Sequence, residues 1–230
     1  MEKMIVAIDG PAGAGKSSVT RLLAERLRFQ YLDTGAMYRA VTLSAIDQGI
    51  DLLDEPALQI IATKIEIVFD GEEIFIDGKN STAAIRKPEV TRSVASVANA
   101  PLVRSYLVDL QRRIASQGNF VCEGRDQGTV AFPDSFCKIF LTASPRARAQ
   151  RRVDQLSRSG ESVELEAIIR EQEIRDQQDS TRVVGRLKKA SDAIELLTDN
   201  LTLEEVVAEL ERIVRRRIED KTAPASADTT

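Results

Sequence analysis

A glycine-rich segment near the start of the chain constrains the fold more than any other feature. Residues 10–17 read Gly-Pro-Ala-Gly-Ala-Gly-Lys-Ser, directly after the apolar run 4–8 and directly before segment 18–27, which has helical spacing of leucines. This is the spacing of a phosphate-binding loop between a strand and a helix. Glycines let the backbone fold back, so that successive N–H groups and the helix N-terminus point at one anion. The sequence therefore predicts an α/β fold that binds a nucleoside triphosphate.

Two side chains complete this loop. Lys16 places a compact positive charge on the outer phosphates, and the Ser17 hydroxyl is suited to help hold a magnesium ion. The alternative is a chance glycine-rich turn, and the exact spacing with both flanks argues against it. The predicted ATP-binding residues are Gly10, Pro11, Ala12, Gly13, Ala14, Gly15, Lys16, Ser17 and Ser18.

Composition excludes several classes of function. The net charge of -4 gives no overall attraction to polymeric nucleic acid or an anionic membrane. The chain has no histidine, which excludes Ser-His-Asp devices and histidine-ligated metal sites. Cys122 and Cys137 lie in or beside apolar runs and fit reduced packing residues. With no signal-like segment and no long apolar stretch, we expect a cytoplasmic protein.

Strand-like and helix-like segments alternate along most of the chain. Five short β-rich runs, separated by segments with helical period, indicate a parallel five-stranded sheet flanked by helices, as in P-loop NTPases. Pro, Gly and a Thr202–Glu205 capping box mark helix ends. The expected strands are 4–8, 30–32, 119–123, 138–142 and 193–197, and further expected helices are 36–48, 101–117 and 203–220.

Two regions depart from this alternation. Runs 65–69 and 73–77 are joined at Asp70-Gly71, which is a strong hairpin signal, so we expect a small antiparallel insertion over 61–92. Between 146 and 186, nine arginines lie on helix-like sequence. This segment is either a helical lid over the site or an ordinary solvated helical face.

The resulting domain plan has a core with one insertion. The core comprises 1–60 and 93–220 and includes the lid at about 146–186, whereas 61–92 form the insertion. At 230 residues, one principal domain is the default. The polar segment 221–230 has no apolar periodicity and is expected to be a disordered tail.

Polar residues follow the second and third expected strands. Asp33-Thr34-Gly35 follows one strand, with Tyr38 and Arg39 a helical turn later, and Glu123-Gly124-Arg125-Asp126 follows the other. Ligands of open parallel sheets bind at this carboxyl edge. Taken singly, Asp33 could be a helix cap and Arg125–Asp126 a surface ion pair. Their joint position favours one site that faces the phosphate-binding loop.

Six motifs make a resemblance specific. In order they are IDGPAGAGKSS, YLDTGAMYRA, PLVR, EGRDQGTVAFPD, KIFLTAS and RDQQDSTR. With the hairpin insertion, they resemble the bacterial cytidylate kinases of the P-loop nucleoside monophosphate kinase superfamily, over residues 8–210. The resemblance implies transfer of phosphate from ATP with Mg²⁺ to CMP or dCMP in pyrimidine nucleotide metabolism. We expect a monomer with no nucleic acid or membrane partner.

The resemblance also implies residue roles. Arg39 and Arg125 are similar to the arginines that hold the acceptor phosphate, whereas Arg175 and Asp179 resemble the pair at the ribose and neighbouring phosphate. The residues that resemble the reader of the cytosine edge are Arg104, Asp126 and Arg182. The full expected acceptor set is Asp33, Thr34, Tyr38, Arg39, Ser96, Arg104, Arg125, Asp126, Arg175, Asp179 and Arg182, and the expected catalytic set is Lys16, Arg125, Asp126, Arg148 and Arg152.

The chemistry of these residues agrees with such a reaction. The second pKa of a phosphate monoester is about 6, so the acceptor is already nearly dianionic and needs no general base. Cytosine presents an amine donor beside N3 and O2 acceptors, which a carboxylate and arginines complement. Three positions depart from the family pattern: Glu123 replaces an aspartate, Ala95 falls where a serine is expected, with Ser96 beside it, and Thr34 replaces a common serine.

Two rival interpretations remain at this level. One is a kinase for another small acceptor, such as UMP, AMP or shikimate, against which RDQQDSTR and the insertion argue. The other is a non-catalytic P-loop nucleotide sensor, which would need the loop but not the acceptor-side arginines.

Overall fold

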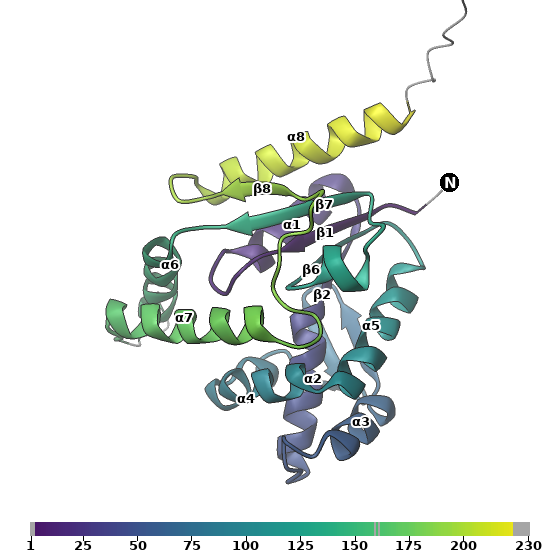
Figure 1. Cartoon of the computed structure of the whole chain (residues 1–230), viewed down its shortest axis with the longest axis vertical. Coiled ribbons are helices and arrows are strands. Elements are labelled where there is room, and N and C mark those ends of the chain that lie inside the picture. Colours follow the sequence, from purple (N-terminus) through teal and green to yellow (C-terminus); the bar gives the residue numbers. More distant parts are fainter. Residues whose placement is uncertain (1–2, 159, 161, 223–230) are drawn as a thin grey trace, which may run out of the picture.

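The structure is a computed structural model that describes residues 3–158, 160 and 162–222. Its main sheet has five parallel strands in the order β2-β6-β1-β7-β8 (Figure 1). The register pairs Asp9 with Gly124, so β1 and β6 end side by side. The strands are β1 Ile5–Asp9, β2 Gln30–Asp33, β6 Phe120–Gly124, β7 Cys137–Thr142 and β8 Ile194–Leu197. All five expected strands are confirmed.

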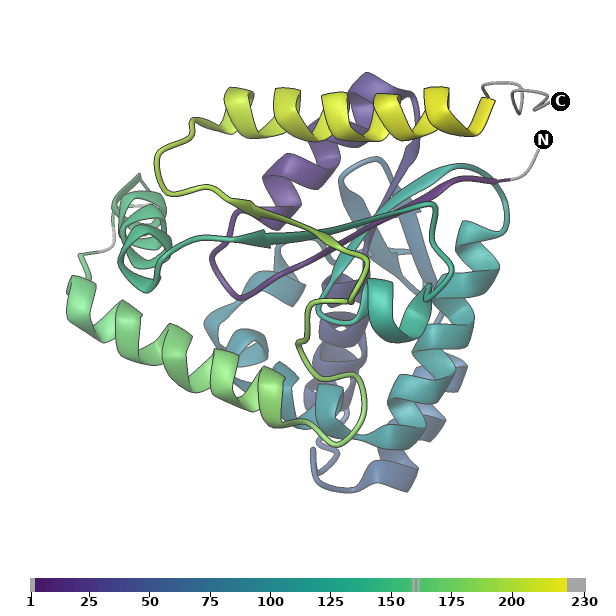
Figure 2. The same cartoon turned by 45° about the horizontal axis from the view of Figure 1, so that its top comes forward.

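Helices cover both faces of this sheet, as Figure 2 shows. One face packs against α1 and α8 through a cluster that includes Ile8, Leu23 and Leu210. The other face packs against α2 and its neighbours. The helices are α1 Lys16–Leu27, α2 Thr34–Asp47, α3 Glu55–Lys64, α4 Pro88–Asn99, α5 Pro101–Ala115, α6 Pro145–Arg158, α7 Leu165–Thr181 and α8 Leu203–Thr222, with short turns η1 Ala84–Arg86 and η2 Gln127–Ala131.

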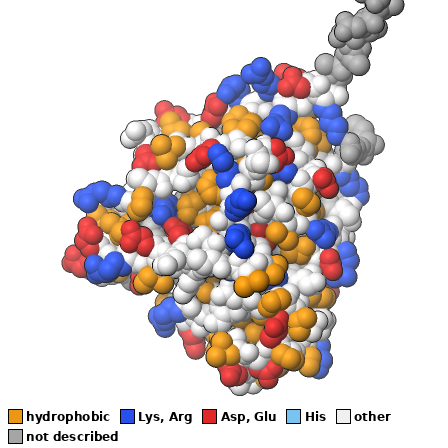
Figure 3. All heavy atoms as spheres, in the orientation of Figure 1, with side chains coloured by type: hydrophobic (Ala, Val, Ile, Leu, Met, Phe, Trp, Pro, Cys, Tyr) orange, Lys and Arg blue, Asp and Glu red, His pale blue; other side chains and the backbone are white. Residues whose placement is uncertain are grey.

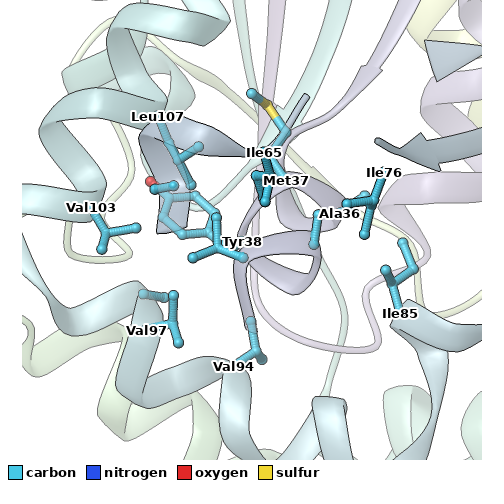
Figure 4. Packing of buried hydrophobic residues seen from close by; sticks show 14 of the residues in the cluster. Ala36, Met37, Tyr38, Ile65, Ile76, Ile85, Val94, Val97, Val103 and Leu107 are labelled. Atoms are coloured by element: carbon cyan, nitrogen blue, oxygen red, sulfur yellow. The ribbon is translucent and has the colours of Figure 1, made fainter. Parts of the chain in front are cut away.

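The second core surrounds α2. Most residues of α2 are buried in it, and Met37 and Val41 are fully buried. Tyr38 lies among Val97, Val103 and Leu107 in Figure 4, which places its ring between α2, α4 and α5. The packing of apolar residues from three helices therefore fixes the start of α2, where Asp33 ends β2 and Thr34 begins the helix.

The expected hairpin is confirmed, but the segment around it is more helical than the sequence suggested. Strands β3 Ile67–Asp70 and β4 Glu73–Ile76 pair antiparallel, and a third strand, β5 Lys79–Asn80, was not expected. Residues 61–64 belong to α3, and 88–92 belong to α4. Each flanking helix begins with its own signal, because Asp54 accepts a hydrogen bond from the Ala57 N–H and Pro88 occupies the first turn of α4.

Other expectations on the chain can be compared directly. Cys122 and Cys137 are free and buried, as packing residues should be. Thr202 and Glu205 form the expected capping box, with bonds of 2.8 and 3.3 Å between each backbone N–H and the other's side chain. Helix α8 reaches Thr222, two residues beyond its expected end, and the rest of the expected tail lies outside the described residues.

The surface bears charges of both signs. On the face drawn in Figure 3, Lys and Arg side chains are interspersed with Asp and Glu side chains. This pattern accompanies the net charge of -4. Within the described residues, no helix combines the length and the apolar character that crossing a membrane requires.

Candidate active site

The glycine-rich loop joins β1 to α1 and approaches β7 closely. A Cβ on Gly10 would lie 2.0 Å from the Leu141 carbonyl oxygen, so only glycine fits there. Gly13 and Gly15 have φ of 76° and 85°, in the left-handed region that favours glycine. We call residues 10–17 the donor loop. Its backbone has the conformation that turns N–H groups toward an anion at the start of α1.

Lys16 is buried within this loop. Its Nζ donates to the carbonyl oxygens of Gly10 and Pro11 at 2.8 and 2.7 Å. Burial and the nearby Arg125 guanidinium, opposed by Glu123, lower the pKa of Lys16 to about 7. An incoming triphosphate would add negative charge next to this ammonium group and favour its protonated form.

Glu123 faces the donor loop from the end of β6. The Tyr31 hydroxyl donates to Glu123 Oε1 at 2.5 Å, and the carboxyl group is buried. Burial raises the pKa of Glu123 to about 7, with Asp33 adding to the rise, and Lys16 and the Ser17 hydroxyl oppose it. The sequence placed Glu123 among the polar residues at the end of the third expected strand and marked it as a departure from the family pattern, but the expected site set did not include it. Its position after the third strand was the signal that could have assigned it to the site.

The donor side offers few oxygen ligands for a cation. The described residues hold no cluster of three or more His, Cys, Asp or Glu that could bind a metal. Ser17 and Glu123 are near each other at the donor loop, because the Ser17 hydroxyl interacts with the Glu123 carboxyl group and lowers its pKa. Magnesium commonly keeps waters and binds phosphates with one or two protein groups. The residues present fit that mode of binding.

Asp33 and Thr34 both form side-chain hydrogen bonds to backbone groups near the site. Asp33 Oδ1 accepts the Ala36 N–H at 2.9 Å and so caps α2. The Thr34 hydroxyl donates to the Glu123 carbonyl oxygen at 2.6 Å and is 2% exposed as a residue. Its only hydrogen is thus used within the protein, which leaves its oxygen to act as an acceptor. The helix-cap interpretation of Asp33 is correct, whether or not it also meets a ligand.

Arg104 and Asp126 form a buried ion pair. Their side chains are only 3% and 5% exposed, and Arg104 Nη1 also donates to the Ala98 carbonyl at 2.9 Å. The Arg104 guanidinium lies 5.2 Å from the centre of the Tyr38 ring. Burying two charges is costly unless other bonds satisfy them, so such a pair is weak evidence for stability. Its place beside the sheet edge favours a role in recognition.

Asp179 of α7 ties two more arginines together. Its Oδ2 accepts from Arg125 Nε at 2.8 Å, and its Oδ1 pairs with Arg182. Although burial raises it, these two arginines hold the pKa of Asp179 below its ordinary value. Arg182 Nε also donates to Asn99 Oδ1 at 2.8 Å, which connects α7 to the end of α4. The structure therefore links the motif after β6 with the motif at the end of α7.

Two further arginines converge on the same region. Burial, together with the charges of Arg125 and Arg39, lowers the pKa of Arg175 to about 10, which indicates that the three guanidinium groups are neighbours. Arg39 is anchored by bonds from its Nη1 to Thr91 Oγ1 at 2.8 Å and to the Ile85 carbonyl at 3.3 Å. These cations form a concentrated positive region that would suit a phosphate group.

Helices α6 and α7 lie side by side next to β7 (Figure 1) and contact the donor loop. Arg148 Nη1 is 2.6 Å from the Ala12 carbonyl oxygen and 2.6 Å from Asp176 Oδ2. Asp176 Oδ1 accepts the Ala12 N–H at 3.0 Å. We call these three residues the loop clasp. Asp176 was not among the expected site residues, because nothing local in the sequence predicts its contact with residue 12.

Among the described residues, the other expected lid and acceptor residues form no hydrogen bond with the donor loop or with the buried ion pairs above. Arg152 is exposed and donates to Gln155 at 2.9 Å, whereas Arg151 contacts Thr198 at 3.0 Å. Of the two expected catalytic lid arginines, the structure thus brings only Arg148 against the donor loop. Ala95 and Ser96 are both half-buried on α4. Ser17 and Ser18 are exposed at the start of α1, next to the mouth of the loop.

The site combines the donor loop with arginines on the acceptor side and on helices α6 and α7. This combination defines the class of P-loop phosphotransferases whose acceptor carries a phosphate group. Comparison with known proteins makes the class specific. The family model for cytidylate kinase matches residues 6–216. This chain therefore belongs to the cytidylate kinase family, and the resemblance found in its motifs is confirmed.

Individual relatives agree over nearly the whole chain. The cytidylate kinase of Rhodopirellula baltica is 46% identical over 228 residues, which cover 99% of this chain and 100% of that protein. That of Pelotomaculum thermopropionicum is 49% identical over 207 residues, 88% of this chain and 92% of the relative. Among solved structures, an uncharacterized protein from Eubacterium ventriosum aligns with a TM-score of 0.51, 14% identity, and coverage of 94% and 99%. That last likeness concerns the fold alone.

Proposed function

We propose that this protein transfers the γ-phosphate of ATP to CMP or dCMP, giving ADP and CDP or dCDP. The single observation that carries the choice of acceptor is the buried Arg104–Asp126 pair beside the acceptor-side arginines. A carboxylate accepts from the cytosine amine, and an arginine donates to its N3 and O2. Uracil would place a carbonyl against Asp126, and a buried mismatch of this kind discriminates strongly.

The acceptor phosphate is assigned to Arg39, Arg125 and Arg175. Their guanidinium groups lie close enough to lower the pKa of Arg175, so an anion among them would relieve mutual repulsion. Asp179 and Arg182 then face the nucleoside end, with Asp179 suited to a ribose hydroxyl. Asp33, Thr34, Tyr38 and Ser96 complete the proposed acceptor site by shaping its walls.

Phosphoryl transfer here needs positioning and charge cancellation. Lys16 and the donor-loop N–H groups hold the triphosphate, and Arg148 approaches the same loop from α6. When bound, Mg²⁺ would neutralise phosphate charge, held from the protein side by Ser17 with Glu123 nearby. Since the acceptor oxygen is already ionised, no residue must remove a proton. Exclusion of water by α6 and α7 would limit ATP hydrolysis.

The proposed division into parts follows from these roles. Residues 146–186 act as a lid, 61–92 as the acceptor-binding insertion, and 1–60 with 93–220 as the core. Hydrogen exchange with and without ATP and CMP tests this division, because protection should rise in the lid and the insertion more than elsewhere. A cytoplasmic location and a monomeric state also belong to the proposal, and sedimentation analysis tests the second.

An ADP-release assay with five acceptors tests the activity. CMP and dCMP should support ADP formation, whereas UMP, AMP and shikimate should do so at a rate at least about tenfold lower. Equal rates with UMP and CMP would overturn the assignment of Arg104 and Asp126 to the base. Nucleotide binding with no acceptor-dependent ADP formation would favour the alternative of a P-loop sensor.

A further inference from the structure

Asp9 is the last residue of β1 and directly precedes the donor loop. It is 3% exposed, and its two carboxylate oxygens each accept a backbone N–H, from Gln127 and from Gly128, both at 2.8 Å. The two bonds span 118 and 119 positions of the sequence. Hydrogen bonds to an ionised acceptor are about twice as strong as neutral ones. Asp9 therefore joins the donor strand firmly to the segment after Arg125 and Asp126.

These bonds fix the backbone next to Asp126. The Asp126 carbonyl oxygen accepts the Val130 and Ala131 N–H groups at 2.8 and 3.1 Å, which starts η2. On the other side, the β1–β6 register holds Gly124 next to Asp9. Arg125 and Asp126 thus lie between Gly124, which pairs with Asp9 in the sheet, and Gln127, which donates a hydrogen bond to Asp9.

Close packing leaves this segment little room to shift. A Cβ on Gly128 would lie 3.2 Å from Lys138 Cδ and 3.4 Å from Asp9 Oδ2. The Lys138 ammonium in turn pairs with Asp192 at 2.8 Å. Gly128 is thereby held between two side chains, and its own lack of a side chain permits the short bond to Asp9.

The buried carboxylate has an energetic cost. Burial raises the pKa of Asp9 to about 6, and the Asp126 charge adds to the rise, against the two backbone hydrogen bonds. An unpaired buried charge is costly, and here two backbone N–H groups and the Lys16 charge offset part of that cost. A position that served packing alone would be filled more favourably by an apolar residue.

We propose that Asp9 is a positioning residue for base recognition. By holding the Gln127 and Gly128 N–H groups, it fixes the Asp126 carboxylate against Arg104 in the orientation that reads the acceptor base. The inference rests on the proposed function, because it takes Arg104 and Asp126 as the base-reading pair.

The substitution Asp9→Asn tests this role with almost no change of shape. One oxygen becomes an amide NH₂ that cannot accept, so one backbone N–H loses its partner and the segment after Asp126 shifts. We expect the KM for CMP to rise about tenfold and the preference for CMP over UMP to fall at least about fivefold. The KM for ATP should change less than about twofold, although Asp9 adjoins the donor loop.

A double-mutant cycle separates positioning from general stability. If Asp9 acts through Asp126, then Asp126→Asn alone and the double variant should show the same CMP over UMP preference. A purely structural role would lower the activity with both acceptors in either background and leave the preference unchanged. That second pattern, with soluble and folded variants, would overturn the inference.

Two further variants keep the test decisive. Gly128→Ala perturbs the same contact from the other side and should reduce the preference for CMP as well. Asp192→Asn removes the neighbouring ion pair but not the Asp9 bonds, and should leave both KM values within about twofold. If Asp9→Asn does not fold, an unchanged preference in Gly128→Ala would overturn the inference. If the wild-type protein itself showed no preference for CMP over UMP, that result would count against the proposed function.

Discussion

Arg125 lies where the donor and acceptor halves of the site meet. Its Nε donates to Asp179, its charge lowers the pKa of Lys16, and its neighbours include Arg175. One guanidinium thus lies near an acid and a cation of α7 and near Lys16 of α1.

Arg125→Ala should remove acceptor binding selectively. Each charge-assisted hydrogen bond to a phosphate contributes about 1.5–3 kcal/mol, so losing two weakens CMP binding by about a hundredfold or more. ATP affinity should stay within about twofold, as measured by calorimetry with each nucleotide alone. Arg212→Ala, which removes a surface pair with Glu209 on α8, is the matched control. Weakened ATP affinity with normal CMP affinity would refute the assignment.

Asp9 should give the protein a specific pH dependence of stability. Its folded pKa of about 6 lies above the ordinary value of 3.8, so the folded state binds this proton more tightly than the unfolded state. Stability from this group is therefore present at low pH and is lost as pH rises from about 4 to 6. The free energy of unfolding of the wild type, minus that of Asp9→Asn, should fall over this range in urea titrations. A flat difference would show that Asp9 titrates normally.

The positions of candidate site residues were predictable from the sequence where the signal is local. The donor loop was found from eight consecutive residues, and Arg104, Asp126 and Asp179 from short motifs. Asp9, Glu123 and Asp176 were not assigned, because each acts through a partner far away in the chain. Asp176 meets residue 12 across 164 positions, and no periodicity or motif encodes such a pair.

At the scale of elements, α7 connects both halves of the proposed site. Asp176 contacts the donor loop, and Asp179, one turn later, holds Arg125. Residues three and four apart lie on one helical face, which explains how a single helix reaches both. The sequence predicted a helical segment here but left open whether its arginines form a lid or a solvated face. The ion pairs of Arg148 and Arg182 favour the first interpretation.

Asp176→Ala should disrupt the loop clasp. Arg148 would lose its buried partner and the Ala12 N–H its acceptor, so the guanidinium would no longer be held at the donor loop. We expect kcat to fall about tenfold in steady-state assays. Glu166→Ala is the matched control, since it removes an exposed pair with Arg146 between the same helices and should change kcat less than twofold. Equal small effects would mean that the clasp does not contribute to catalysis.

Helix α8 depends on its capping box for a defined start. Thr202→Ala removes the acceptor of the Glu205 N–H and should lower the free energy of unfolding by about 1 kcal/mol, measured in urea. Thr202→Ser keeps the hydroxyl and should restore most of the loss. Kinetic constants should not change, because α8 packs on α1 on the face of the sheet away from the acceptor side. A change in KM would indicate that the two faces are coupled.

At the scale of the whole molecule, the site gathers like charges before any ligand binds. Arg39, Arg125 and Arg175 come from three separate elements, and their mutual repulsion opposes folding. The five-stranded sheet holds these elements together through two apolar cores on opposite faces. The sequence predicted this architecture well, since strand and helix signals are local. It missed β5, α3 and α4, which form around a hairpin whose ends the pattern does not define.

A ligand phosphate should therefore stabilise the protein more than the rest of the nucleotide does. CMP should raise the thermal unfolding midpoint by several degrees more than cytidine at equal concentration, and inorganic phosphate should reproduce part of the difference. Differential scanning fluorimetry with an external dye checks this. Equal shifts with cytidine and CMP would contradict the placement of the acceptor phosphate among these arginines.

The tyrosines give the molecule an optical property of its own. The chain has three tyrosines and no tryptophan. Two of the three belong to the site, because Tyr31 donates to Glu123 on the donor side and the Tyr38 ring faces Arg104 on the acceptor side. Tyr31 and Tyr38 thus lie beside the two halves of the proposed site, and we expect nucleotide binding to change the tyrosine spectrum of the protein without any attached label.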